Sequence, residues 1–167
     1  MAGKRSIAAR PLGAANRSRY GHWESDTVLG ESQGGAGILT LGERKLGFTM
    51  IGKPMRRSGR YVNARAQQLI ARQPRPVRTI TVDNGTEFHA YKVLEAHVAA
   101  RFYFAAPHHA WERGTNENTN GLIRQYLPKR RSMEHVAQAA CTRIVTKLNR
   151  RPSKRLGYRT PEECHVP

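Results

Sequence analysis

The amino-acid sequence predicts an α/β fold, in which one mixed sheet carries helices on both faces. Residues alternate between two faces from 22 to 29, which is the period of a strand. The period becomes that of a helix between 60 and 73, and short β-branched or aromatic runs then alternate with further helical segments. The predicted order is three strands, a helix, a strand, a helix, a strand and two helices. Three antiparallel strands extended by parallel strands, five in all, fit this order.

The first third of the chain is expected to form the antiparallel part of the sheet. Its first strand is 22–29, followed by the glycine-rich turn GESQGGAG at 30–37. The segments ILTL at 38–41 and FTMI at 48–51 then read as a hairpin around LGERKLG. Alternation within the first strand places Glu24, Asp26 and Val28 on one face.

The middle of the chain changes from strand to helix and back. Apolar residues recur at helical spacing over 60–73, and the segment QPRP ends that helix. The β-branched run VRTITV at 77–82 predicts a strand. Asn84 and Glu87 have the N-cap and N3 spacing of a capping box, which predicts a helix to about Val98.

The last third of the chain is predicted to contain one strand and two helices. The aromatic run RFYFA at 101–105 predicts the fifth strand. A helix is expected to start between Trp111 and Asn118 and to end near Tyr126. An apolar face with helical spacing predicts the last helix over about 133–150.

One folded domain accounts for the length of 167 residues, with a core over 21–167. Residues 1–20 contain basic residues, no acid and little apolar content, which predicts an extended or poorly ordered arm. Cys141 and Cys164 lie far apart without metal-ligand spacing, as in reduced cytosolic proteins. With no long apolar run and no secretion signal, we expect a cytoplasmic protein and no membrane partner.

The chain is strongly basic, with 29 Lys and Arg against 12 Asp and Glu and a formal net charge of +17 at pH 7. A charge of this size is typical of a protein that binds a polyanion. Periodic apolar segments run through most of the chain, which favours a folded domain over a disordered basic tail. We therefore expect salt-sensitive, sequence-tolerant binding of nucleic acid.

Three acidic residues stand out in this basic chain. Asp26 lies within a strand, where Asp is disfavoured, and Asp83 follows a strand at the end where α/β sheets form ligand crevices. Glu117 lies near the start of a helix, with Asn120 and Arg124 on its face. Converging carboxylates repel one another unless cations lie between them, and oxygen ligands suit Mg²⁺ or Mn²⁺. The pattern predicts two metal ions about 4 Å apart that catalyse phosphoryl transfer.

Other interpretations of the polar residues stay open. An isolated Asp on a strand is often a solvated edge residue or a turn former. Glu87 can reach the same site as Asp83, but its spacing from Asn84 favours the capping role. His108 and His109 invite a zinc interpretation, but no second Cys or His pair stands at ligand spacing, so zinc is not expected.

Four segments of the chain resemble a known family. They are GHWESDTV, TITVDNGTEF, APHHAWERGTNENTNGLIRQYLPK and LNRRPSKRLGYRTPEE. Together they resemble the catalytic domain of bacterial insertion-sequence transposases of family thirty, over about residues 20–163. These transposases belong to the DDE superfamily, which includes retroviral integrases. The resemblance therefore implies a ribonuclease H-like fold for 21–167.

The resemblance also implies the catalytic residues and the chemistry. It assigns Asp26, Asp83 and Glu117 as the catalytic, metal-binding triad, and 33 residues separate the last two, as in the family. The implied cofactor is Mg²⁺ or Mn²⁺, as two ions when DNA is bound. The implied activity is cleavage at a transposon end followed by attack of the freed 3′-hydroxyl on target DNA. Paired transposon ends imply a homodimer or a larger assembly.

The residues expected to contact DNA surround this triad or lie in the basic stretches on either side of it. They are Arg113, Asn116, Asn120, Arg124, Lys129, Arg130 and Arg131. Arg124 is the best candidate for a phosphate contact beside the metals, while the asparagines also fit a capping role.

Family members are much longer than this chain and carry helix-turn-helix segments before the core. Only about 20 residues precede the first predicted strand, so we expect the N-terminal DNA-binding domain to be absent from this chain. Two alternatives to a transposase core follow: an inactive remnant that only binds DNA, and a stand-alone ribonuclease H-like nuclease.

Overall fold

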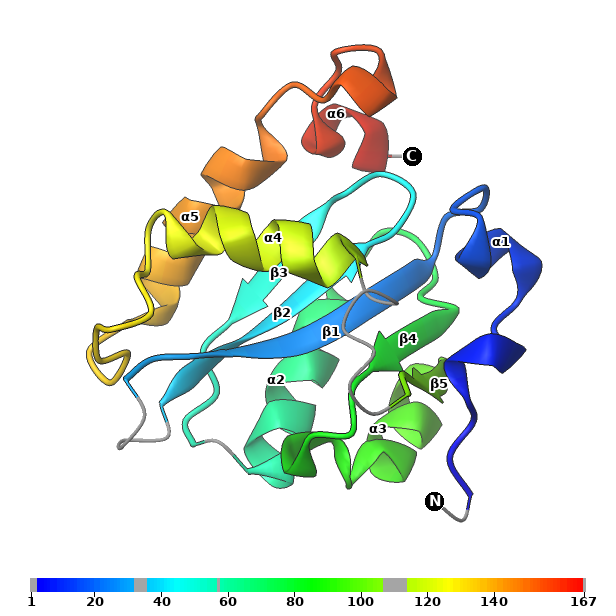
Figure 1. The fold of residues 1–167 in the computed structure, drawn as a ribbon, viewed down its shortest axis with the longest axis horizontal. Helices are drawn as coiled ribbons and strands as arrows, with labels where there is room; N and C mark the ends of the chain where they lie inside the picture. Colours follow the sequence, from blue (N-terminus) through cyan, green and yellow to red (C-terminus); the bar gives the residue numbers. More distant parts are fainter. Residues whose placement is uncertain (1–2, 32–35, 57, 107–113, 167) are drawn as a thin grey trace.

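A computed structural model gives the structure of the chain and describes residues 3–31, 36–56, 58–106 and 114–166 (Figure 1). Its strands are β1 (His22–Leu29), β2 (Gly37–Glu43), β3 (Thr49–Gly52), β4 (Thr79–Val82) and β5 (Arg101–Phe104). They form one five-stranded sheet in the order β3-β2-β1-β4-β5. β1 pairs antiparallel with β2 and parallel with β4, while β3 and β5 extend the two sides. The mixed sheet predicted from the sequence is confirmed.

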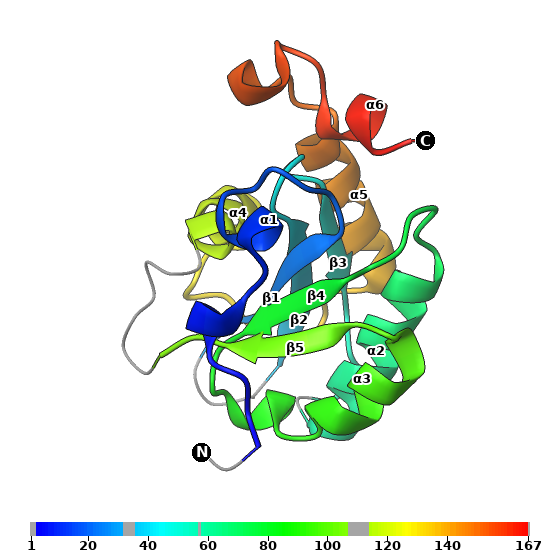
Figure 2. The ribbon, with the colours of Figure 1, turned by 90° about the vertical axis from the view of Figure 1, so that its right-hand side faces the viewer.

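The helices cover both faces of this sheet, as predicted. They are α1 (Leu12–Ala15), α2 (Gly59–Ala71), α3 (Tyr91–Val98), α4 (Gly114–Arg124), α5 (Gln138–Asn149) and α6 (Pro161–His165), with the 3₁₀ helices η1 (Ile7–Ala9), η2 (Thr86–Phe88) and η4 (Lys154–Leu156). Figure 2 shows α1 and α4 on one side of the strands and α2 and α3 on the other. None of the helices in the described parts of the chain is long and apolar enough to cross a membrane.

Two hydrophobic clusters separate these layers. Trp23 is fully buried in the cluster beneath α2 and α3, with Ile80 and Phe102 from the neighbouring strands. Val28 packs on the other face of the sheet, in the cluster with Ile123 of α4 and residues of α5. The alternation predicted for β1 is therefore confirmed, because Trp23 and Val28 point to opposite faces.

The N-terminal residues differ from the expected poorly ordered arm. Residues 3–20 lie against the sheet, where the Phe104 amide donates to the Arg5 carbonyl at 2.8 Å. Ile7 and Ala14 are buried. The physical reason is that β5 is an edge strand with unpaired backbone groups, which an extended segment can satisfy. The N-terminal segment can be ordered with few apolar residues, because its backbone hydrogen-bonds to the edge strand.

The segment after β4 also differs from the prediction. Instead of one helix from Asn84, the chain forms η2 and then α3, and the N-cap residue of η2, Gly85, gives it no side-chain cap. The side-chain amide of Asn84 donates to the Ala105 carbonyl at 3.0 Å, and its Oδ1 accepts from Lys4 Nζ at 3.2 Å. The predicted capping box with Glu87 therefore does not form. The Asp83 carboxylate accepts the Gly85 N–H at 2.8 Å. This local bond competes with a helical start, as Asx turns do.

The last two helices predicted from the sequence correspond to α4 and α5, and each is shorter than predicted. α4 ends at Arg124, and single turns continue the chain to Leu127, where the Tyr126 and Leu127 amides donate to the Ile123 carbonyl at 2.9 Å. α5 begins at Gln138 rather than near Met133, although Met133 is buried in the core as its apolar face predicts.

Candidate active site

Asp26 lies on the central strand, on the face covered by α4. It sits opposite Thr40 in the pairing of β1 with β2. Its Oδ1 accepts the Thr27 amide at 2.9 Å, and its Oδ2 accepts the side-chain amide of Asn120 in α4 at 2.9 Å. The carboxylate is half-buried, so the strand presents it at the border between core and solvent.

Asp83 lies beside Asp26 at the end of the neighbouring parallel strand. The parallel register pairs Glu24 with Thr81, and Asp26 and Asp83 each follow two residues after their member of this pair. If both backbones continue the register, the two carboxylates point to the same face. Gly85 follows in the turn, where a Cβ would lie 2.9 Å from Asp83 Oδ1 and 2.7 Å from Glu87 Oε2. Only glycine lets both carboxylates approach this turn so closely.

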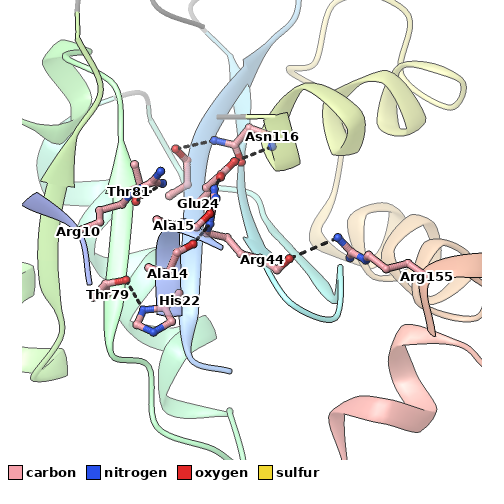
Figure 3. Close-up of polar contacts among 11 residues, drawn as sticks. Arg10, Ala14, Ala15, His22, Glu24, Arg44, Thr79, Thr81, Asn116 and Arg155 are labelled. Carbon is pink, nitrogen blue, oxygen red and sulfur yellow. Dashed lines mark hydrogen bonds and ion pairs between the residues drawn. The ribbon is translucent and has the colours of Figure 1, made fainter. Parts of the chain in front are cut away.

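Glu24, two residues before Asp26 on the same face, holds the start of α4. Its Oε2 accepts the Asn116 backbone amide at 2.9 Å, and the Asn116 side chain donates to the Ser25 carbonyl at 3.2 Å (Figure 3). A carboxylate is favourable here because the first amides of a helix have no partner within the helix. Glu24 therefore fixes where α4 begins relative to β1.

Arg44 neutralises Glu24 inside the protein. The two side chains form an ion pair, in which Arg44 is 4% exposed and Glu24 is fully buried. Arg44 also donates to the carbonyls of Ala14 at 2.9 Å and Ala15 at 3.4 Å, which ties α1 to the same network. Burial, with a smaller contribution from nearby Arg10, lowers the pKa of Arg44 to about 10, so it stays protonated at neutral pH. The network links the N-terminal segment to the helix that carries Glu117.

Glu117 is exposed on the flank of α4 that faces β4. On the other flank, Thr115 and Thr119 lie close to Gly42 of β2. Asn116 and Asn120, four residues apart, anchor the face between these flanks to β1. In the described residues no group of three or more His, Cys, Asp and Glu side chains could hold a metal ion. The structure thus carries Asp26 on β1, Asp83 directly after the neighbouring strand β4, and Glu117 on α4, the helix that packs on β1.

One atom beside Asp26 fits a cation. Asn120 Oδ1 is buried and, within the described ranges, has no hydrogen-bond partner. A buried acceptor that receives no hydrogen bond is unfavourable unless a water molecule or a cation interacts with it. Together with carboxylates on two adjacent strands, this oxygen makes a donor set of the kind that Mg²⁺ or Mn²⁺ prefers.

The residues predicted to contact DNA fall into two groups. Asn116 is 2% exposed, so the structure leaves it no surface for DNA, and Asn120 is held at Asp26. Arg124 is half-buried and donates to the Leu29 carbonyl at 2.7 Å, and burial lowers its pKa. Its guanidinium joins α4 to the end of β1 instead of standing free for a phosphate.

The other predicted DNA contacts are at the surface or outside the described residues. Lys129, Arg130 and Arg131 are exposed in the turn after α4, close to the end of β1, where the Glu31 amide donates to the Arg131 carbonyl at 3.2 Å. Arg113, like His108 and His109, lies outside the described residues.

Sequence reasoning missed several residues around this site. Arg10 reaches from the N-terminal segment to Thr81, two residues before Asp83, at 3.5 Å from Nη1 to Oγ1. Glu87, for which the sequence favoured a capping role and left a place near Asp83 as the alternative, is buried close to the same turn as Asp83. The signal for Glu24 was present, because alternation places it on the Asp26 face. Nothing in the local pattern around Arg10 pointed to β4, because that contact joins residues far apart in the sequence.

Comparison with known proteins finds several transposases that are similar to this chain. The transposase for insertion sequence element IS4351 of Bacteroides fragilis is 40% identical over 161 residues, which cover 96% of this chain and 49% of that protein. The probable transposase for insertion-like sequence element IS1161 of Streptococcus salivarius is 36% identical, over 95% of this chain and 45% of that protein. Transposase InsI for insertion sequence element IS30A of Escherichia coli (strain K12) is 36% identical, over 94% and 41%. The chain thus spans about half the length of the curated relatives it matches.

The fold has a counterpart among solved structures. The catalytic core domain of BIV integrase superposes with a TM-score of 0.64, covering 87% of this chain and 93% of that domain at 20% identity. This likeness shows the ribonuclease H-like integrase-core fold that the sequence resemblance implied. No family model matches the chain.

Proposed function

We propose that this chain is the catalytic core of an insertion-sequence transposase of family thirty, which cuts DNA and joins the freed 3′-hydroxyl to target DNA. The observation that carries the proposal is the pair of carboxylates on adjacent parallel strands. Asp26 faces α4, and Asp83 follows the parallel neighbour of its strand, two residues after the paired Glu24 and Thr81. A net charge of +17 around two such acids fits an enzyme whose substrate is a polyanion.

Asp26, Asp83 and Glu117 are the residues proposed to hold two Mg²⁺ or Mn²⁺ ions. When bound, such ions supply Lewis-acid activation of the attacking water or 3′-hydroxyl and of the scissile phosphate, so no side-chain base is required. The chain itself orients the acids: Asn120 holds the Asp26 carboxylate, and Glu24 fixes the start of the helix that carries Glu117. Ligand orientation by neighbouring hydrogen bonds is a general requirement of metal sites.

The proposed substrates are a transposon end and a target DNA. The exposed turn of Lys129, Arg130 and Arg131 is proposed to contact phosphates, because it is a compact group of positive charges with free side chains. Arg113 stays a prediction from the sequence. Two transposon ends require two active sites, so we also propose a homodimer or a larger assembly as the active form.

A plasmid-nicking assay tests the proposal. Wild type, Asp83→Asn and the exposed control Glu134→Gln are incubated with supercoiled DNA and Mn²⁺, and DNA binding is measured in parallel by fluorescence anisotropy. We expect wild type and Glu134→Gln to nick, and Asp83→Asn to bind DNA without nicking it. Wild type that binds DNA but never nicks it, at any Mn²⁺ concentration, would contradict the proposal and favour a DNA-binding remnant.

Strand transfer separates the proposal from the second alternative. A pre-cut DNA end with a free 3′-hydroxyl is supplied together with a target plasmid, and joined products are measured. We expect covalent joining that needs both Asp26 and Asp83. Cleavage of RNA–DNA hybrids without any joining would indicate a ribonuclease H-like nuclease instead.

A further inference from the structure

We propose that a basic cleft on the side of α4 opposite Glu117 binds the sugar-phosphate backbone of a second stretch of DNA, away from the scissile phosphate. The cleft has a volume of about 530 Å³ and lies between α4, the turn after β2 and the segment that follows α5. Its wall includes Arg17, Arg151, Lys154, Arg155, Thr115 and Asn118. The choice of DNA as the ligand rests on the proposed function, whereas the cleft itself does not.

The charge of this cleft has one sign. Four basic side chains line it, and no carboxylate does so among the described residues. Burial and then nearby Arg17 lower the pKa of Arg155, which means that the two positive charges repel each other. Glu43 partly offsets this repulsion from behind, but its carboxylate accepts the Leu46 amide at 2.6 Å in the core. Like charges gathered in a concave surface focus a positive potential that a polyanion neutralises.

Two of the basic groups can be placed on opposite sides of the cleft. Arg155 Nη1 donates to the Arg44 carbonyl at 3.4 Å, so its guanidinium lies over the turn between β2 and β3 (Figure 3). A Cβ on Gly47 in that turn would lie 2.9 Å from Arg155 Nη2. Arg17 lies at the start of α4, where a Cβ on Gly114 would be 3.6 Å from its Nη2. Charges fixed on both sides of a groove position a phosphate backbone better than free surface charges.

A second observation at the cleft is independent of charge. Thr115 lines the cleft and is 7% exposed, and its Oγ1 is buried without a hydrogen-bond partner in the described parts of the chain. Its methyl group lies close to Gly42, where an added Cβ would be 3.2 Å away. A buried hydroxyl without a partner is costly, and hydroxyl groups are common donors to phosphate oxygens. The cleft thus offers a neutral donor beside the cations.

The position of the cleft explains why it would bind a separate stretch of backbone. Thr115 and Asn118 lie on the cleft side of α4, whereas Glu117 is exposed and does not line the cleft. A helix with its side chains is about 10 Å across, so one phosphate cannot touch both flanks. DNA in the cleft is therefore either the continuation of the cut strand or a second duplex, and both present the same phosphates.

A binding measurement without metal tests the cleft. Fluorescence anisotropy with a labelled 20-base-pair duplex is recorded in EDTA over a range of salt concentrations. We compare the cleft variant Arg151→Ala/Lys154→Ala with the matched control Arg72→Ala/Arg143→Ala, which removes two exposed charges outside the cleft. We expect the cleft variant to bind at least about 10-fold more weakly and to lower the slope of log K against log salt by roughly 2. Equal losses in both variants would show diffuse attraction and overturn the proposal.

The hydroxyl gives a second test that leaves the net charge unchanged. Thr115→Val replaces the hydroxyl with a methyl group, and Thr115→Ser keeps the hydroxyl. We expect weaker DNA binding for Thr115→Val at an unchanged melting temperature, and near wild-type binding for Thr115→Ser. Unchanged binding in Thr115→Val would contradict the role of the hydroxyl.

Nicking assays on the same variants separate this proposal from the proposed function. If the cleft variants bind DNA normally and wild type cuts DNA, the cleft proposal is wrong and the proposed function stands. A wild type that never cuts, with binding lost specifically in the cleft variants, would overturn the proposed chemistry and keep the cleft.

Discussion

Glu24 and Asp26 lie two residues apart on the same face of β1, yet their surroundings are opposite. Glu24 is fully buried and paired with Arg44, and it accepts a backbone amide from the start of α4. Asp26 is half-buried at the level of Asp83 and accepts the side-chain amide of Asn120. Glu24 pairs with Arg44 in the core, whereas Asp26 lies at the border between core and solvent. The buried acid organises the fold, and the acid nearer solvent is the one we propose as a metal ligand.

The largest expected effect separates these roles by activity. Asp26→Asn is expected to lower the rate of metal-dependent DNA cleavage at least about 100-fold, because transition-state stabilisation by a metal is worth several kcal/mol. The free energy of unfolding should change by less than about 1 kcal/mol, since a half-buried group is replaced by one of the same shape. Nicking rates and urea unfolding measure the two quantities. A variant that unfolds easily but cuts normally would reverse our assignment.

Glu24 is expected to show the opposite result. Glu24→Gln leaves Arg44 buried without its counter-charge, which costs about 3–5 kcal/mol in the free energy of unfolding. The double variant Glu24→Leu/Arg44→Met removes both charges and should recover most of that loss. Urea unfolding of the three proteins tests this. If Glu24→Gln is as stable as wild type, the ion pair does not organise the fold.

Protonation of the buried His165 should weaken the protein in acid. His165 stacks on Phe48 and contacts Tyr20 and Gln73, and burial followed by the charge of Arg75 lowers its pKa from 6.5 to about 4. The unfolded chain binds this proton first, so the contribution is complete above pH 6.5 and is lost as the pH falls towards 4. The change amounts to about 3 kcal/mol.

Urea unfolding between pH 7 and pH 4 measures this loss, with His165→Phe as the comparison. The variant lacks the titrating group, so its stability should depend less steeply on pH in this window. Parallel curves for the two proteins would show that His165 is not the group responsible.

The smallest expected effect concerns Asn120, whose side-chain amide donates to the Asp26 carboxylate. Asn120→Ala removes the amide that orients Asp26, and we expect an affinity for Mn²⁺ at least about 10-fold lower. The melting temperature should hardly change, because Asn120 is only half-buried. Calorimetric titration measures the affinity, and Asn118→Ala, two residues before Asn120 and on the cleft side of α4, is the control. Equal Mn²⁺ affinity in wild type and Asn120→Ala would remove Asn120 from the site.

Local patterns were enough to predict the sheet and its two faces. Alternation in β1 placed Glu24, Asp26 and Val28 together, and the structure confirms that all three face α4. Strand and helix periods depend on neighbours in the sequence, and the burial of a face follows from them. The same reasoning placed Asp83 at the end of a strand, and the structure makes that strand the parallel neighbour of β1.

Contacts between distant segments were not predictable in this way. Arg10 meets Thr81, and Arg124 is held by the Leu29 carbonyl, although nothing near either arginine in sequence points to its partner. The capping box at Asn84 failed because the Asp83 carboxylate takes the Gly85 amide first. Such outcomes depend on the competition between partners in the folded chain, which a linear pattern does not contain.

A calorimetric Mn²⁺ titration is the most direct test of the central claim that Asp26 and Asp83 form a metal site. Wild type, Asp26→Asn, Asp83→Asn and the control Glu134→Gln are titrated alone and again with a short DNA duplex. The account predicts saturable binding in wild type and Glu134→Gln, at least when DNA is present, and its loss in both Asp variants. Wild type that binds no Mn²⁺ with or without DNA, or Asp variants that bind as wild type does, would contradict it.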